Sequence, residues 1–216
     1  MDYKRIEQYI LTHTDDEGDV LRALDRDAHV RLMRPRMISG HLQGRLLKMI
    51  VRMLKPHHIM EIGTYTGYAA LCMAEGMETP DGSIHTIEVD DEMEDFIRKY
   101  LQLSPWGNKV TLHLGDAMEI IPQVMRQYKI DLVYMDANKR EYIDYYHLVM
   151  QYLPVGGVIL ADNTLWDGKV VEDPLPTDTQ TCSILAFNDL VQADKRVENL
   201  ILPLRDGLSL IYKVSE

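Results

Sequence analysis

The chain has 216 residues, 46% of them hydrophobic and 26% charged, a composition typical of a folded globular protein rather than of a disordered, fibrous or membrane-spanning one. At this length a single core is expected to bury roughly 70% of the surface that the unfolded chain exposes, so the fold needs no disulfide or structural metal. The 34 acidic and 23 basic residues give a formal charge of −11, which disfavours a broad phosphate-binding surface and leaves nucleic acid a minor alternative.

The first third of the chain is predicted to be helical, because its apolar residues recur at intervals of three and four. The pattern indicates three helices, which contain Ile6, Tyr9 and Ile10, then Val20, Leu21, Leu24 and Ala28, then Leu42, Leu46, Leu47, Ile50 and Leu54. Pro35 separates the second helix from the third.

From residue 57 the pattern changes to short apolar runs that end at Gly, Asp or Asn, which predicts strands. Five such runs lie at 58–63, 83–89, 109–115, 130–136 and 155–162, and segments of helical composition lie between them at 67–77, 91–103, 116–127 and 139–152. Strands joined by helical crossovers form an open parallel sheet with helices on both faces.

The regular pattern lapses after residue 162. Segment 164–180, which contains Pro174 and Pro176, is predicted to be a long connection and a candidate wall of a site. A helix is expected at about 183–193, and the runs 197–204 and 207–213 are predicted to close the chain as an antiparallel hairpin. The predicted fold class is therefore α/β, with a mixed, mostly parallel sheet of seven strands.

The cysteines and the N-terminus bear on the cellular compartment. Cys72 and Cys182 lie far apart without CxxC spacing, which predicts neither a disulfide framework nor a zinc knuckle. The N-terminus mixes charged and apolar residues from the start, unlike a secretory signal, and no apolar stretch approaches the ~18 residues that a bilayer requires. We therefore expect a cytoplasmic protein with no membrane partner.

The first predicted strand runs into a glycine-containing turn at residues 61–67, EIGTYTG. Ligands of open α/β sheets bind beyond the carboxyl ends of the strands, and two glycines permit a tight turn before a helix whose free N–H groups face the ligand. Glu88, at the end of the second strand, is placed to accept hydrogen bonds from both hydroxyls of an adenosyl ribose. The four-residue spacing of Gly63 and Gly67 favours S-adenosylmethionine over a dinucleotide; alternatively, both are turn residues only.

Polar residues end the fourth and fifth predicted strands, Asp136 on one and Asp162 with Asn163 on the other. If these strands are neighbours, ~4.8 Å apart, the side-chain oxygens can converge on one hard cation, Mg²⁺, Mn²⁺ or Ca²⁺. The alternative is that the carboxylates only cap the turns or helices that follow. Lys139, in the first turn of the next helix, could face the same site as a general base, or it is a solvated surface lysine.

Four segments in order resemble the cation-dependent O-methyltransferases, the family that includes caffeoyl-CoA and catechol O-methyltransferases and their bacterial relatives. They are MEIGTYTGYAALCMA, DLVYMDANKREYIDYY, GGVILADNTLWDGKVV and LPLRDGLSLIYK, and the resemblance covers about residues 35–214. It implies a Rossmann-like class I methyltransferase in a single domain over 1–216. Residues 1–55 would be a helical cap and dimer region, and residues 56–216 the cofactor-binding and catalytic core.

The resemblance also implies roles for individual residues. Asp136, Asp162 and Asn163 would hold the divalent cation, with Mg²⁺ expected first, and Lys139 with Asp136 would be catalytic. The S-adenosylmethionine site would comprise Glu61, Gly63, Thr64 and Tyr68 at the methionine part, Glu88 at the ribose, Asp116 and Ala117 at the adenine, the backbone of Ile38 at the carboxylate, and Asn138. Trp166 and Asp167 would lie beside the acceptor.

Three positions depart from the family pattern. Ala69 stands where many relatives have a serine that helps to bind the cofactor carboxylate, so that contact is lost or made otherwise. Asn138 replaces the second aspartate of the common DADK motif, which keeps a hydrogen-bonding group and removes a charge. Asp167 stands where the plant enzymes have asparagine, so their acceptor specificity is not assumed here.

The function implied by the resemblance is methyl transfer from S-adenosylmethionine to one of two vicinal oxygens of a catechol-like small molecule, with a homodimer expected. One alternative is methylation of 5-hydroxyuridine in tRNA, for which a local basic patch is available in Arg31, Arg34, Arg36, Arg52 and Lys55. Another is a non-enzymatic adenosyl-binding protein.

Overall fold

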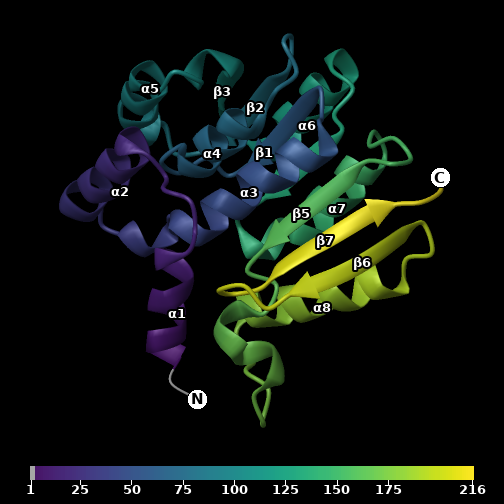
Figure 1. The fold of residues 1–216 in the computed structure, drawn as a ribbon. Coiled ribbons are helices and arrows are strands. Elements are labelled where there is room, and N and C mark those ends of the chain that lie inside the picture. The colour runs from purple at the N-terminus through teal and green to yellow at the C-terminus, as the bar shows by residue number, and fades with distance from the viewer. Residues whose placement is uncertain (1–2) are drawn as a thin grey trace.

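The structure of the chain, a computed structural model, describes residues 3–216, so the first two residues of the expected helical cap lie outside the described residues. Its centre is a seven-stranded sheet with the strand order β3-β2-β1-β4-β5-β7-β6 (Figure 1). The strands are β1 (His58–Ile62), β2 (Ser83–Glu88), β3 (Val110–Leu114), β4 (Leu132–Met135), β5 (Val158–Asp162), β6 (Val197–Leu202) and β7 (Leu208–Lys213). The first five are parallel, and β7 runs antiparallel to both of its neighbours. The predicted fold class is confirmed.

The strand order places the carboxyl ends of β1 and β4 at the switch point of the sheet. From β1 the order runs outward to β2 and β3 on one side, and to β4 and β5 on the other. Strand β4 is fully buried, with Leu132 and Tyr134 in the core on one face and Val133 and Met135 in the core on the other. Burial on both faces is typical of a central parallel strand, which explains the near-continuous apolar runs of the sequence.

Helices cover both faces of the sheet. They are α1 (Tyr3–Thr12), α2 (Asp19–Arg31), α3 (Gly40–Leu54), α4 (Tyr68–Gly76), α5 (Glu94–Leu103), α6 (Ala117–Gln127), α7 (Tyr142–Met150) and α8 (Thr179–Ala193). Helices α3 and α4 lie on one face of the sheet, and α6, α7 and α8 lie on the other (Figure 1). Their apolar side chains form the core on each face. Helix α2 packs on α4 through Leu21, Leu24 and Ala28. Among the described residues, no helix combines the length and the apolar character needed to cross a membrane.

The structure differs from the sequence prediction mainly at element ends. Helix α8 begins at Thr179, earlier than expected, because Asp178 caps it by accepting hydrogen bonds from the backbone N–H of Thr181, at 3.0 Å, and from its hydroxyl, at 2.6 Å. The predicted helix 139–152 opens with a short 3-10 helix, Lys139–Glu141, before α7. The connection 164–180 contains a further short, kinked helix, Trp166–Val171, in which Asp167 and Gly168 have positive φ.

Candidate active site at the carboxyl ends of the strands

The turn after β1 packs directly on the end of β4. Gly63 has a φ of 97°, and a Cβ at this position would lie 2.2 Å from the backbone oxygen of Asp136. The backbone N–H of Asp136 donates to the carbonyl oxygen of Ile62 at 2.9 Å. Only glycine combines this conformation with so close an approach, so Gly63 holds the β1 turn against the residue that ends β4.

Glu61, on β1, is a buried carboxylate with one unpaired oxygen. The hydroxyl of Thr86 donates to its Oε2, and the hydroxyls of Thr86 and Thr64 are 2.5 Å apart. Glu61 Oε1 is buried and has no hydrogen-bond partner among the described residues. Burial, reinforced by the negative charges of Asp136 and Glu88, raises the pKa of Glu61 to about 8. A positively charged ligand with a hydrogen-bond donor would pair with the free oxygen and favour the ionised form of Glu61.

Glu88, at the end of β2, lies beside the end of β3. Its Oε2 accepts the backbone N–H of Tyr65 at 2.6 Å, and its Oε1 accepts that of Asp90 at 2.9 Å. The backbone oxygen of Glu88 accepts the N–H of Gly115, which brings the β3 turn with Asp116 and Ala117 next to it. Asp116 caps α6 by accepting the N–H of Met118 at 2.8 Å. The predicted ribose and adenine residues therefore lie at adjoining strand ends.

Lys139 lies inside the protein beside Asp136. Only 8% of its side chain is exposed, which rules out a solvated surface lysine. Its Nζ donates to Asp136 Oδ1 at 2.7 Å and to the hydroxyl of Tyr142 at 2.8 Å. The Tyr142 hydroxyl in turn lies 3.0 Å from the backbone oxygens of Met135 and of Asp162, which share its single proton. Tyr142 thus ties Lys139 to the ends of both β4 and β5.

Asp162, at the end of β5, is 3% exposed and surrounded by donors. Its Oδ2 accepts from the side-chain amide of Gln43 at 2.5 Å and from the hydroxyl of Tyr134 at 2.8 Å, while its Oδ1 accepts the backbone N–H of Asn163 at 2.8 Å. Burial and the negative charge of Asp136 raise the pKa of Asp162 to about 6, against the opposing effects of Lys139 and of the two side-chain donors.

The helix-capping alternative does not account for the two aspartates. Asn138, not Asp136, caps the short helix that follows β4, by accepting the N–H of Arg140 at 3.3 Å. The segment after Asp162 enters no helix before Trp166, and the N-cap residue there is Leu165. Both carboxylates are therefore available for another role.

The donor set at the ends of β4 and β5 fits a hard divalent cation. Asp136 and Asp162 directly follow Met135 and Ala161, which are paired in register across the two strands. Two carboxylates and the amide oxygen of Asn163 are the oxygen ligands that Mg²⁺ prefers. The set contains only two acidic side chains. Among the described residues, no three His, Cys, Asp or Glu side chains lie together as a possible metal site.

Three predicted cofactor residues have other partners in the structure. The hydroxyl of Tyr68 donates to the carboxylate of Glu17, and its ring packs in the cluster between α2 and α4. The carbonyl oxygen of Ile38 accepts from Arg205 Nη1 at 2.8 Å. Asn138 is exposed and serves as the cap described above. The structure does not bring the side chains of Tyr68 and Asn138 into the hydrogen-bonded group around Asp136 and Asp162.

Trp166 and Asp167 follow the β5 end in an unusual backbone conformation. Their φ angles are 46° and 55°, and the N–H of Trp166 donates to the carbonyl oxygens of Asn163 and Asp206, both at 3.2 Å. The indole Nε1 of Trp166 is buried without a hydrogen-bond partner among the described residues, whereas Asp167 is exposed. This segment forms the rim of the site beside Asn163.

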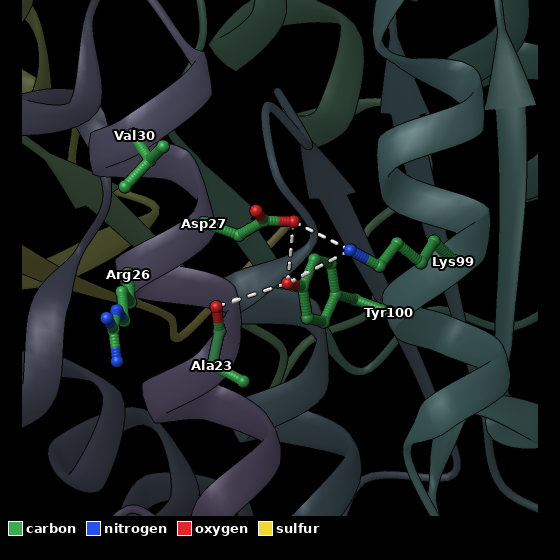
Figure 2. Close-up of a pocket in the computed structure, with 6 residues that line it drawn as sticks. All are labelled: Ala23, Arg26, Asp27, Val30, Lys99 and Tyr100. Atoms are coloured by element: carbon green, nitrogen blue, oxygen red, sulfur yellow. Dashed lines mark hydrogen bonds and ion pairs between the residues drawn. The ribbon is translucent and has the colours of Figure 1, made fainter.

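A hollow of about 370 Å³ lies elsewhere, between α2 and α5 (Figure 2). Three of its polar groups already pair with one another, since Asp27 accepts from Lys99 at 2.7 Å and from the hydroxyl of Tyr100 at 2.9 Å. None of the strand-end residues lines it, so the candidate site and this hollow are separate.

Sequence reasoning missed Gln43, Tyr134 and Tyr142, which hold Asp162 and Lys139. A signal was present for Gln43, because it shares the buried face of α3 with Leu47 and Ile50, and a buried amide on an apolar helix face requires partners. The tyrosines gave no such signal, since aromatic residues are common in buried strands and helices.

Comparisons with known proteins identify the family of the chain. The sequence matches the family model described as O-methyltransferase over residues 12–214. A caffeoyl-CoA O-methyltransferase 2 from Eucalyptus globulus is 31% identical over 188 residues, which is 83% of this chain and 76% of the plant enzyme. The S-adenosylmethionine complex of TomG, an O-methyltransferase of tomaymycin synthesis from Streptomyces achromogenes, has a TM-score of 0.90 at 25% identity and covers 100% of both chains.

A second solved structure has a similar fold. The SAH-bound methyltransferase PaMTH1 from Podospora anserina has a TM-score of 0.88 at 26% identity, covering 98% of this chain and 94% of that one. The family model itself spans nearly the whole sequence, including all four motifs that carry the resemblance. The chain therefore belongs to the O-methyltransferase family and is an enzyme of that family.

Proposed function

We propose that the protein transfers a methyl group from S-adenosylmethionine to one hydroxyl of a catechol-like small molecule, with the help of a divalent cation. The observation that carries this proposal is the buried contact of Lys139 Nζ with Asp136 at the end of β4, next to the second buried carboxylate, Asp162. A proton acceptor and two oxygen ligands at the switch point of the sheet are what such a transfer requires.

The cofactor site is assigned to the ends of β1, β2 and β3. The unpaired Glu61 Oε1 and the free N–H groups at the start of α4 would face the methionine part, Glu88 would accept from the ribose hydroxyls, and Asp116 with Ala117 would flank the adenine. The SAM-bound and SAH-bound neighbours support this choice of ligand. Ala69 provides no hydroxyl, so the cofactor carboxylate would depend on backbone groups.

Asp136, Asp162 and Asn163 would hold the divalent cation, and Mg²⁺ is the first choice. When bound, the cation lowers the pKa of one acceptor hydroxyl and fixes its orientation, while S-adenosylmethionine provides an electrophilic methyl group on its sulfonium. The caffeoyl-CoA O-methyltransferases to which the chain is similar support an acceptor with an aromatic ring.

Lys139 would accept the proton of the reacting hydroxyl at Nζ. Burial limits the conformations open to the Lys139 side chain. The hydroxyl of Tyr142 accepts a hydrogen bond from Nζ and so holds it at the strand ends. The free indole N–H of Trp166 would donate to the acceptor, and Asp167 would lie at the rim. The N-terminal helices, within residues 1–55, would cover the acceptor and contribute to a homodimer.

The alternative of tRNA methylation has less support. Within the basic set considered for it, Arg31 pairs with Asp27 at 2.5 Å, and Arg52 lies 3.7 Å from Glu78, so these charges are partly neutralised. A non-enzymatic adenosyl-binding protein would have no use for a buried lysine placed against a carboxylate.

Product analysis by mass spectrometry tests the proposal. Purified protein is incubated with S-adenosylmethionine, Mg²⁺ and a panel of catechols, with and without a chelator. Methylated catechol that disappears with the chelator is expected. Methylation that is unaffected by the chelator would refute the cation, and no methylation despite measured cofactor binding would shift the substrate to hydroxyuridine-containing RNA.

A further inference from the structure

The two oxygens of Asp162 have different surroundings. Oδ2 accepts two side-chain hydrogen bonds, from Gln43 Nε2 at 2.5 Å and from the hydroxyl of Tyr134 at 2.8 Å. Oδ1 accepts only the backbone N–H of Asn163 at 2.8 Å. A carboxylate oxygen has two lone-pair directions, so Oδ2 is saturated whereas Oδ1 retains one free direction.

The directions of these hydrogen bonds are fixed, because the carboxylate of Asp162 can only accept. Gln43 Nε2 also donates to the Tyr134 hydroxyl at 3.0 Å, so its two hydrogens serve Tyr134 and Asp162. The hydroxyl of Tyr134 therefore donates its only proton to Asp162. With the amide reversed, its oxygen would face the carboxylate and both donations would be lost, so the network has one consistent arrangement.

The network joins three elements that are distant in the sequence. Gln43 comes from α3, Tyr134 from β4 and Asp162 from β5. All three side chains are buried, with exposures of 1%, 0% and 3%, so water does not compete for these hydrogen bonds. Asp162 is therefore held in one orientation before any ligand arrives.

We propose that Gln43 and Tyr134 are positioning residues that restrict Asp162 to binding a cation through Oδ1 alone, and thereby favour Mg²⁺ over Ca²⁺. This inference rests on the proposed function, because it assumes a cation at the ends of β4 and β5. Mg²⁺ requires a small, near-octahedral shell with single oxygens, whereas Ca²⁺ takes more ligands and readily binds both oxygens of one carboxylate. A saturated Oδ2 therefore disfavours Ca²⁺ selectively.

The test measures cation selectivity rather than activity. Mn²⁺ bound to the full-length protein is followed by electron paramagnetic resonance and displaced with Mg²⁺ or with Ca²⁺, which yields the ratio of the two affinities. The variants are Tyr134→Phe, which removes one hydroxyl, and Gln43→Leu, which removes the amide at similar volume. Tyr146→Phe is the matched control, because Tyr146 is also fully buried and its hydroxyl donates to Asp194 Oδ2 at 2.9 Å, away from the site.

We expect Tyr134→Phe to shift the affinity ratio toward Ca²⁺ by about fivefold and Gln43→Leu by about tenfold, shifts in the range of the net contribution of one typical hydrogen bond. Tyr146→Phe should leave the ratio unchanged. An unchanged ratio in both test variants, with wild-type protein that binds Mg²⁺, would overturn this inference alone. Wild-type protein that binds no Mn²⁺ would overturn the cation of the proposed function and this inference with it. If Gln43→Leu does not fold, as judged by circular dichroism, Tyr134→Phe decides the outcome.

Discussion

Gly63 is the position at which one added methyl group tests the packing of the active site. A Cβ there would lie 2.2 Å from the backbone oxygen of Asp136 and 2.8 Å from its carbonyl carbon, and the φ of Gly63 is 97°. The obstructing atoms belong to the backbone just after β4, so they cannot move aside as the end of a flexible side chain could. Gly63→Ala must therefore displace either the β1 turn or Asp136.

The size of the effect follows from a comparison with Gly67, four residues later. Gly67 also has a positive φ, 81°, but its nearest atom to an added Cβ is a methyl group of Ile97 at 3.5 Å, an ordinary contact. Gly67→Ala should therefore cost only the strain of a left-handed alanine, about 1–2 kcal/mol. Gly63→Ala adds overpacking, so we expect it to lower the free energy of unfolding by about 3–4 kcal/mol.

Urea denaturation followed by circular dichroism measures both variants under the same conditions. The folded fraction of Gly63→Ala should also bind Mn²⁺ more weakly than Gly67→Ala, because only the first substitution disturbs the contact with Asp136. Equal losses of stability in the two variants would refute the argument that the β1 turn rests on the backbone of β4.

Three further predictions concern the charged residues. Lys139→Met should lower kcat by about 10²-fold or more while the affinity for S-adenosylmethionine in calorimetry stays unchanged, and an unaltered kcat would rule out the base. Asp136→Ala should abolish chelator-sensitive transfer and retain cofactor binding; residual transfer that still needs the cation would contradict its assignment as a ligand. Because the pKa of Glu61 is raised from 4.5 to about 8, the ligand-free folded state binds more protons than the unfolded state in that window, so stability should fall as pH rises through it. Glu61→Gln should flatten that decline in urea midpoints measured from pH 5 to pH 8, and an equally steep decline would show that other groups cause it.

The positions of the main site residues could be predicted from the sequence because they depend on strand ends. Apolar runs that stop at Asp136 and at Asp162 mark the carboxyl ends of two parallel strands, and the sheet topology then brings them together. Lys139 follows from the same logic, since three residues carry it into the first helical turn after β4. Local pattern and fold class were sufficient for this part of the site.

The contacts that orient these residues could not be predicted in the same way. Gln43 lies 119 residues from Asp162 and 91 from Tyr134, and its position depends on how α3 lies over the sheet. The same holds for the hydroxyl of Tyr68, a residue that the family resemblance assigns to the cofactor site, because its partner Glu17 lies 51 residues away, before α2. Trp166 and Asp167 adopt positive φ without being glycine, which no composition rule indicates.

The distribution of charge at the strand ends connects the folded structure to its ligands. Four carboxylates, Glu61, Glu88, Asp136 and Asp162, lie at adjoining strand ends and are accompanied there by one buried cation, Lys139. The pKa values of Glu61 and Asp162 are raised, which shows that ionising these carboxyls without a ligand is unfavourable in the folded chain. A sulfonium cofactor and a divalent cation would each supply positive charge at this edge. Binding of either ligand would therefore relieve a cost that is already present in the folded chain.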